Sequence, residues 1–130
     1  MKLGITGSRS ITEFDFIPYF TLKDPDFLAF CRENGFARRK IAAVICGGAH
    51  GVDTLAADTA EKLQIRSRLI LPDRRKFPGK MIRKGLLERN KKIVDECDLL
   101  LAVWDGHSRG TFYTVRYAEK LQRPVFVIKS

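Results

Sequence analysis

Short apolar runs alternate along the chain with stretches in which apolar residues recur every three to four positions. The short runs predict β-strands, and the helical spacing predicts amphipathic helices between them. We expect strands at residues 2–6, 41–46, 66–71, 98–104 and 124–129. We expect helices at about residues 24–34, 52–63, 80–96 and 112–121. A further helix is expected to start at the capping-box sequence Thr12-Glu13-Phe14-Asp15, and Pro18 limits its length.

The alternation of strands and helices predicts an α/β fold with a mainly parallel sheet of about five strands. The run Ile41–Cys46 is continuously apolar, which is typical of a parallel strand that is covered on both faces. A length of 130 residues with 45% hydrophobic residues suits one domain with one core. Because the chain also has no internal repeat and no linker-like segment, we expect residues 1–130 to form a single domain.

Four polar or glycine-rich turns follow predicted strands, at residues 7–10, 47–53, 72–79 and 105–111. Parallel strands end at the same edge of a sheet, so these turns are expected to meet where α/β proteins bind ligands. In the turn Gly47–Asp53, glycines permit a tight entry into a helix whose free N–H groups attract anions. The expected ligand at this edge is therefore a phosphate or a ribose-phosphate.

The charge of the chain favours an acidic partner. The 24 Lys and Arg residues outnumber the 15 Asp and Glu residues, which gives a formal net charge of +9. One segment, in which Glu88 is the only acid, holds much of this excess in Arg74, Arg75, Lys76, Lys80, Arg83, Lys84, Arg89, Lys91 and Lys92. Such a cluster favours nucleotides, phosphate esters or nucleic acid as partners, and the alternative is a solvated helix face that keeps the chain soluble.

Several classes of protein are disfavoured by what the sequence lacks. The glycine turns match neither the G-x-G-x-x-G dinucleotide fingerprint nor the G-x-x-x-x-G-K-[ST] phosphate loop. Cys31, Cys46 and Cys97 lie far apart, so we expect buried free thiols and no metal site; no cofactor is expected either. No apolar run approaches the roughly 20 residues that span a bilayer, and the N-terminus lacks a signal peptide's apolar stretch. We therefore expect a cytoplasmic protein with no membrane partner.

Four motifs follow one another along nearly the whole chain: Ile5–Arg9, Cys46–Asp53, Arg89-Asn90 and Ser108–Thr111. Together they resemble the SLOG superfamily of Rossmann-like domains, and most of all its YspA-type branch. The resemblance implies a Rossmann-like three-layer sandwich with a nucleotide-like or sugar-phosphate ligand at the edge of its sheet. It also implies a homodimer, because SLOG relatives often pair. Related members include the LONELY GUY phosphoribohydrolases, DNA-processing protein A and proposed sensors of nucleotide-derived signals.

The turns and the resemblance together give a set of candidate ligand-binding residues. By resemblance, three of the turns face a phosphate, and Arg89 matches an arginine of the family. Arg9 and Arg89 would bind phosphate in a bidentate manner, and the alternatives for them are a carboxylate partner or solvent. Asp53 is expected either to bind ribose hydroxyls or to cap the helix that begins beside it. The set is Gly7, Ser8, Arg9, Gly47, Gly48, Ala49, Gly51, Asp53, Arg89, Asn90, Asp105, Ser108, Gly110 and Thr111.

One departure from the family bears on catalysis. In the phosphoribohydrolases a Gly-Thr pair is followed, after two residues, by a glutamate that is thought to drive glycosidic cleavage, whereas Thr114 stands at that position here. Without this acid the hydrolase mechanism loses its general acid/base. The leading hypothesis is therefore a binding module for a nucleotide or a nucleotide-derived ligand, with sensing as its role.

Two alternatives stay open. The first is a nucleotide N-glycosidase in which Arg89 holds the phosphate and Asp53 or Asp105 assists the departing base. The second is binding of single-stranded DNA through the basic segment at residues 74–92. Aromatic residues are not interleaved with these basic residues as they are in a stacking platform, which counts against the second alternative. The sequence leaves open which ligand is bound and whether turnover occurs.

Overall fold

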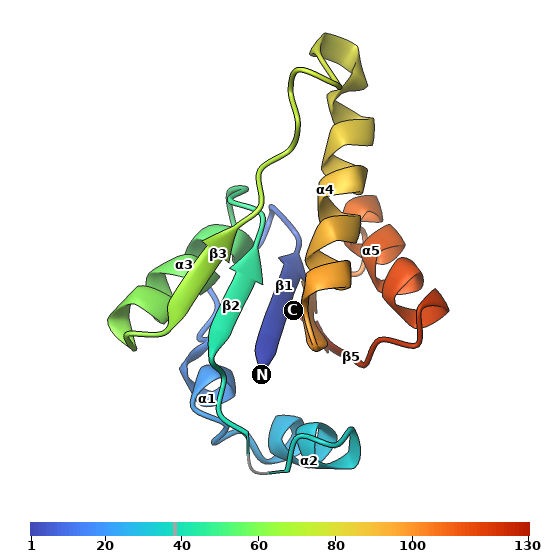
Figure 1. The fold of residues 1–130 in the computed structure, drawn as a ribbon. Helices are drawn as coiled ribbons and strands as arrows, with labels where there is room; N and C mark the ends of the chain where they lie inside the picture. The colour runs from blue at the N-terminus through green and yellow to red at the C-terminus, as the bar shows by residue number, and fades with distance from the viewer. Residues whose placement is uncertain (38) are drawn as a thin grey trace.

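A five-stranded parallel sheet forms the centre of the computed structural model, which describes residues 1–37 and 39–130 (Figure 1). The strands lie in the order β3-β2-β1-β4-β5, and every neighbouring pair is parallel. Their bounds are β1 Lys2–Gly7, β2 Ala43–Cys46, β3 Arg66–Leu69, β4 Leu99–Trp104 and β5 Val125–Lys129. The predicted α/β fold with a five-stranded parallel sheet is confirmed.

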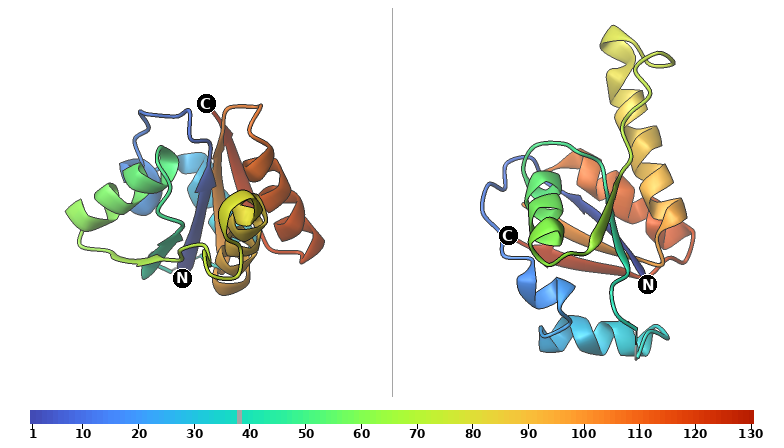
Figure 2. Two further views of the ribbon diagram at one scale, coloured as in Figure 1. Left: turned by 90° about the horizontal axis from the view of Figure 1, so that it is seen from above. Right: turned by 60° about the vertical axis from the view of Figure 1, so that its left-hand side comes forward.

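Helices cover both faces of this sheet and make three layers (Figure 2). The helices are α1 Ile17–Phe20, α2 Pro25–Glu33, α3 Val52–Lys62, α4 Ile82–Glu96 and α5 Arg109–Lys120, and the short 3-10 helix η1 Gly79–Met81 leads into α4. Helices α1, α2 and α3 pack on one face, and α4 and α5 pack on the other. Among the described residues, no helix has the length and apolar character needed to cross a membrane.

Side chains of the central strands are buried on both faces of the sheet, which explains their continuous apolar runs. Leu3 and Val44 point into the cluster formed with α1, α2 and α3. Ile45 and Leu100 point to the opposite side, where Ile93 of α4 packs on them. The three cysteines are free and buried in these two clusters, as the sequence predicts.

The two N-terminal helices show which local signals decide a helix start. Helix α2 begins as expected, with the Asp24 carboxylate accepting a hydrogen bond from the Phe27 N–H at 2.9 Å. The capping-box prediction at Thr12 is wrong, because no helix forms until Ile17 and α1 is only four residues long. Pro18 explains this late start, since proline fits only the first turn of a helix. The Asp15 carboxylate instead accepts from the Ile17 N–H at 3.0 Å.

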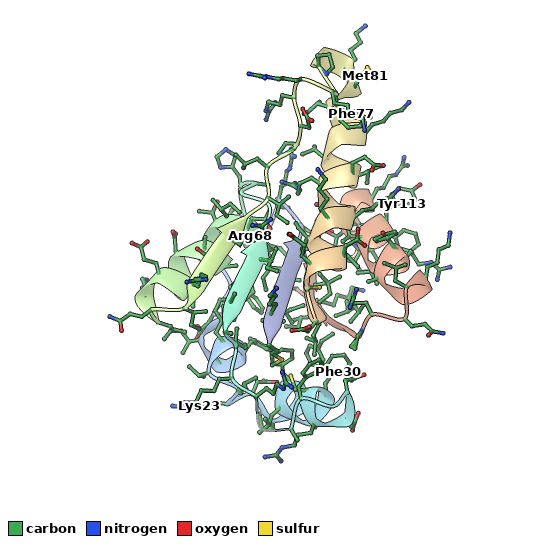
Figure 3. The ribbon with its side chains drawn as sticks, in the orientation of Figure 1. Lys23, Phe30, Arg68, Phe77, Met81 and Tyr113 are labelled. Carbon is green, nitrogen blue, oxygen red and sulfur yellow. The ribbon has the colours of Figure 1, made fainter. Side chains whose placement is uncertain are left out.

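The segment between β3 and α4 projects beyond the carboxyl edge of the sheet (Figures 1 and 2). We call residues 72–85 the arm; it comprises the loop after β3, η1 and the first turn of α4. Phe77 and Met81 lie on this projecting part (Figure 3). Gly85 does not interrupt α4, and its missing side chain leaves room for Phe77, whose Cβ would lie 3.0 Å from an added Cβ. The expected strand at residues 66–71 ends at Leu69, and all four residues of this edge strand are exposed.

Candidate functional site

A pocket of about 750 Å³ opens at the carboxyl edge of the sheet. It lies at the point where the strand order reverses between β1 and β4, since the chain leaves β1 toward one face of the sheet and leaves β4 toward the other. Open α/β sheets bind ligands at such switch points, and the volume falls within the range of small-molecule sites. We call this hollow the rim pocket.

The structure brings most of the candidate residues of the sequence together around the rim pocket. Those that line it are Gly7, Arg9, Ala49, Asp53, Arg89, Asn90, Asp105, Ser108, Gly110 and Thr111. Ser8, Gly47, Gly48 and Gly51 do not line it and serve instead to shape the turns around it.

The sequence reasoning missed several further lining residues: Thr6, Ser10, Arg83, Leu86, Leu87, Arg109 and Tyr113. Arg83, Leu87 and Asn90 stand at helical spacing on α4, so one face of this helix forms a wall of the pocket. The spacing was visible in the sequence. The sequence does not show which face of α4 overhangs the carboxyl edge, because this depends on how far the arm projects. No local pattern encodes that distance.

Arg89 forms a buried, fixed base of the pocket, with only 6% of its surface exposed. Its Nη1 donates to the carbonyl oxygens of Gly47 and, at 3.4 Å, of Ile70, which lie at the ends of β2 and β3. Its Nε donates to the Asn90 Oδ1 at 2.8 Å. Within the described residues its Nη2 has no hydrogen-bond partner, and this atom is not sealed from solvent. The guanidinium group is therefore held rigidly with donor capacity left for a ligand.

Two glycines make room for this arrangement. A Cβ on Gly47 would overlap the Arg89 Cζ, far inside van der Waals contact. Gly51, the N-cap residue of α3, has a φ of +84°, and a Cβ there would lie 2.8 Å from the Arg9 carbonyl oxygen. Glycine is therefore needed at both positions for close packing of the chain on itself, and not only for approach of a ligand.

Asp53 is a nearly buried carboxylate, 8% exposed, on the first turn of α3. Its Oδ2 accepts a hydrogen bond from the Ala49 N–H at 3.1 Å, so it closes the glycine turn, while Gly51 occupies the N-cap position. Burial raises the pKa of Asp53, and the Ala49 N–H, Arg89 and Arg9 oppose this rise.

Two guanidinium groups share this part of the pocket with Asp53. Burial lowers the pKa of Arg89; Asp53 raises it, and the positive charge of Arg9 lowers it further. Arg9 itself is exposed. The three groups together carry an excess of positive charge when Asp53 is ionised. A bound anion would relieve the repulsion between the two arginines.

Asp105 is held in its ionised form by the turns around it. Its Oδ2 accepts from the Ser10 hydroxyl at 2.6 Å, and its Oδ1 accepts from the N–H groups of His107 and Ser108 at 2.7 and 2.8 Å. The Ser10 bond, followed by these two, lowers the pKa of Asp105 well below the ordinary carboxyl range. The Asp105 N–H donates to the Ser8 Oγ at 3.0 Å. Asp105 thus joins the turns after β1 and β4 and is unsuited to donate a proton.

The N-terminus of α5 faces the pocket through Ser108, Gly110 and Thr111. The N-cap Ser108 accepts from the Thr111 N–H at 3.4 Å, and an added Cβ on Gly110 would meet nothing within 4 Å. The Thr114 hydroxyl donates to the Gly110 carbonyl oxygen at 2.7 Å, inside the helix. Thr114 does not line the rim pocket. No cluster of three or more His, Cys, Asp or Glu side chains suited to a metal ion occurs in the part of the chain that the structure describes.

No protein-family model matches the chain, and no curated protein matches it at a significant level. Among solved structures it is similar to one reported for the single-stranded DNA binding mode of DNA processing protein A from Helicobacter pylori. The TM-score is 0.61 and the sequence identity is 23%. The fold is Rossmann-like. The similarity covers 100% of this chain and 66% of the other, so this chain spans just under two thirds of that protein's length.

Substituting Gly47→Ala tests the contact between Gly47 and Arg89. The added methyl group would overlap the guanidinium carbon, so we expect a loss of about 1–3 kcal/mol in the free energy of unfolding, measured by urea denaturation. Gly110→Ala is the matched control, because the same methyl group meets open space on a helix and should leave stability unchanged or raise it. Equal stabilities of the two variants would contradict the assigned role of Gly47.

Substituting Asp53→Asn tests the cost of a buried carboxylate. A raised pKa means that the folded protein binds this proton more tightly than the unfolded chain, so wild-type stability falls as the pH rises above the ordinary carboxyl range. The unfolding free energy of Asp53→Asn, relative to wild type, should therefore rise between about pH 4 and about pH 7. Asp58→Asn removes a carboxylate from the exposed side of the same helix and is the control. Parallel pH profiles for the two variants would argue against the assignment.

Proposed function

We propose that the chain binds a nucleotide or a nucleotide-derived ligand through its phosphate group in the rim pocket. The observation that carries this proposal is Arg89, a buried guanidinium with fixed carbonyl and amide partners and one nitrogen still without a partner among the described residues. Burying a charged group is costly, and a planar guanidinium matches a phosphate better than any other side chain does. An anion bound at this site would offset the cost of burying the guanidinium charge.

The other charged groups of the rim pocket also favour an anion. Arg9, Arg83 and Arg109 also line it, so arginines outnumber the two carboxylates of Asp53 and Asp105. The N-terminus of α5, a helix of 12 residues, adds partial positive charge and free N–H groups on the same side. Asp53 can accept hydrogen bonds from ribose hydroxyls, which would let the pocket distinguish a nucleotide from inorganic phosphate.

We also propose that the chain belongs to the SLOG superfamily, in its YspA-type branch, and acts as a sensor. Three of the motifs that carry this resemblance meet at the rim pocket, and the Arg89-Asn90 pair is joined there by a hydrogen bond. The hydrolase alternative rests on Asp53 alone. Thr114 is bonded within α5 and Asp105 is held ionised, so neither supplies the missing acid. Binding without turnover is therefore the function that the geometry supports best.

Isothermal titration calorimetry with AMP, ADP-ribose, NAD and ribose 5-phosphate tests binding. At least one of these ligands should bind, and Arg9→Ala should weaken it about tenfold because a charged hydrogen bond is lost. Arg32→Ala, on α2 at the opposite edge of the sheet, is the matched control and should bind like wild type (Figure 1). If wild type binds none of the four, or if Arg9→Ala changes nothing, the proposal is wrong.

A second candidate function is binding of single-stranded DNA, and the arm favours it. Its exposed basic residues are Arg74, Arg75, Lys76, Lys80, Arg83 and Lys84, and Asp73 is its only acid. The Asp73 carboxylate accepts from the N–H groups of Arg75 and Lys76 at 3.0 Å, which shapes the basic loop. The solved structure with a similar fold is of a protein described as binding single-stranded DNA. On this hypothesis the arm would extend the rim pocket along a nucleic-acid backbone.

Fluorescence anisotropy with a labelled oligothymidine at several salt concentrations tests this second function. The triple variant Arg74→Glu, Arg75→Glu and Lys76→Glu should bind more weakly, and the slope of log affinity against log salt should become about 2 units shallower. The control is the triple variant Lys23→Glu, Arg32→Glu and Arg39→Glu, which makes the same charge change at exposed positions outside the arm. This variant should keep the wild-type slope. Absent binding, or a slope that the arm variant leaves unchanged, would exclude this candidate.

A further inference from the structure

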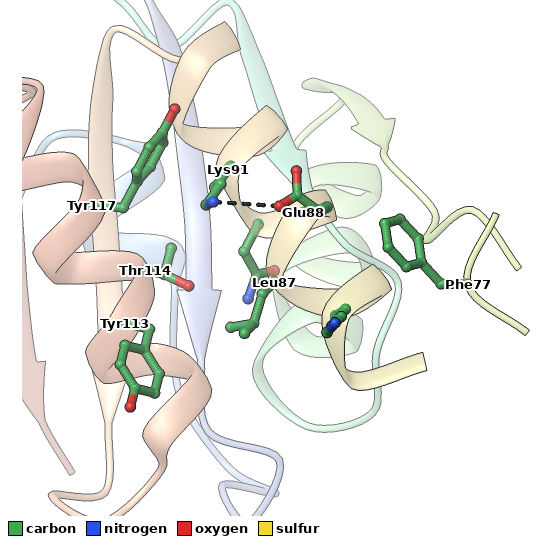
Figure 4. Close-up of a pocket in the computed structure, with 9 residues that line it drawn as sticks. Phe77, Leu87, Glu88, Lys91, Tyr113, Thr114 and Tyr117 are labelled. Atoms are coloured by element: carbon green, nitrogen blue, oxygen red, sulfur yellow. Dashed lines mark hydrogen bonds and ion pairs between the residues drawn. The ribbon is translucent and has the colours of Figure 1, made fainter. Parts of the chain in front are cut away.

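A second hollow of about 440 Å³ lies between α4 and α5 (Figure 4). We call it the side pocket. Figure 4 shows Tyr113 and Tyr117 on α5, Phe77 on the loop before α4, and Leu87, Glu88 and Lys91 on α4 between them. The side pocket is therefore rich in aromatic rings, unlike the rim pocket, in which arginines predominate.

The side pocket adjoins the rim pocket. Leu87, Asn90 and Tyr113 line both hollows, so a ligand that extends from the rim pocket over these side chains would reach the side pocket. Tyr113 is 56% exposed and stands at the junction of the two. Asn90 also receives the hydrogen bond from Arg89 and so connects the proposed phosphate site to this junction.

The charges around the side pocket suit an anionic ligand with an aromatic part. Lys84 and Lys91 line it, and its one acid, Glu88, is paired with Lys91 at 3.3 Å. Lys91 also lies 5.7 Å from the centre of the Tyr117 ring. The Tyr117 hydroxyl donates to Asp95 at 2.8 Å, which fixes the orientation of this ring. A fixed tyrosine ring is a surface on which a planar base can stack.

We propose that the side pocket binds the base of a second nucleoside, which a phosphate joins to the nucleotide in the rim pocket. This inference rests on the proposed function and narrows its ligand to a compound with two nucleoside units. A second copy of the chain fits this surface less well, because it would bring a second basic arm to a surface that already carries Lys84 and Lys91. The two units can belong to a free dinucleotide or to a strand, and both present the same chemistry here.

Calorimetry with AMP and with its 5′-phosphorylated dinucleotide, pApA, tests the inference. Wild type should bind pApA about tenfold more tightly than AMP, which is the contribution of one stacked base. Tyr117→Leu keeps an apolar side chain but removes the ring, so it should abolish this advantage and leave AMP binding unchanged. Lys84→Glu, at an exposed position that lines the side pocket, should also reduce pApA binding selectively. Lys92→Glu makes the same charge change on α4 outside both pockets and is the matched control.

The outcomes separate the two proposals. If AMP and pApA bind equally, or if the advantage of pApA survives both Tyr117→Leu and Lys84→Glu, the side pocket is not a base site and the proposed function stands. If neither compound binds, this inference fails, and the proposed function fails with it only if ADP-ribose, NAD and ribose 5-phosphate do not bind either. A ten-residue oligodeoxyadenosine distinguishes the two sources of ligand: binding much tighter than that of pApA indicates a strand, and equal binding indicates a free dinucleotide.

Discussion

The buried guanidinium of Arg89 connects the sheet to the helix that overhangs its carboxyl edge. Its bonds to the carbonyl oxygens of Gly47 and Ile70 join α4 to the ends of β2 and β3. A charge taken out of water is tolerated only when its hydrogen bonds are made, so these two strand ends and α4 must keep one relative position. The rim pocket is the space that this constraint leaves between α4, α3 and the N-terminus of α5.

The glycines around the pocket show why a glycine-rich turn is an ambiguous sequence signal. Glycine there can leave room for a ligand or for the protein itself. At Gly47 the space is taken by Arg89, and at Gly51 by the loop that carries Arg9. The motif marks the rim pocket only indirectly: it permits close packing of the loops, and that packing positions the charged groups.

The sequence predicted the layers of the fold because strand and helix periodicities are local properties, and the runs at β2 and β4 are strongly apolar. The prediction failed where one residue overrides a pattern. Pro18 overrides the helix start that the capping-box sequence at Thr12 predicts. For Asp105, to which one alternative gave a part in catalysis, the structure shows a carboxylate that accepts hydrogen bonds from the Ser10 hydroxyl and two backbone N–H groups. Arg83 was missed as a pocket residue because the position of the arm is set by tertiary packing. Tyr113 was missed because the packing of α5 beside α4 decides which of its side chains reach the pocket.

The pocket combines a rigid base with adaptable walls, and this division bears on recognition. Arg89 is already ordered, so it would lose little conformational entropy on binding the proposed phosphate, and its position would dictate where that phosphate lies. Arg9, Arg83 and Arg109 are exposed and would have to be ordered by the proposed ligand, which would make their contribution depend on the groups attached to the phosphate. If the proposed function holds, the base of the pocket would select for an anion, whereas the walls and the aromatic side pocket would discriminate among the molecules that carry it.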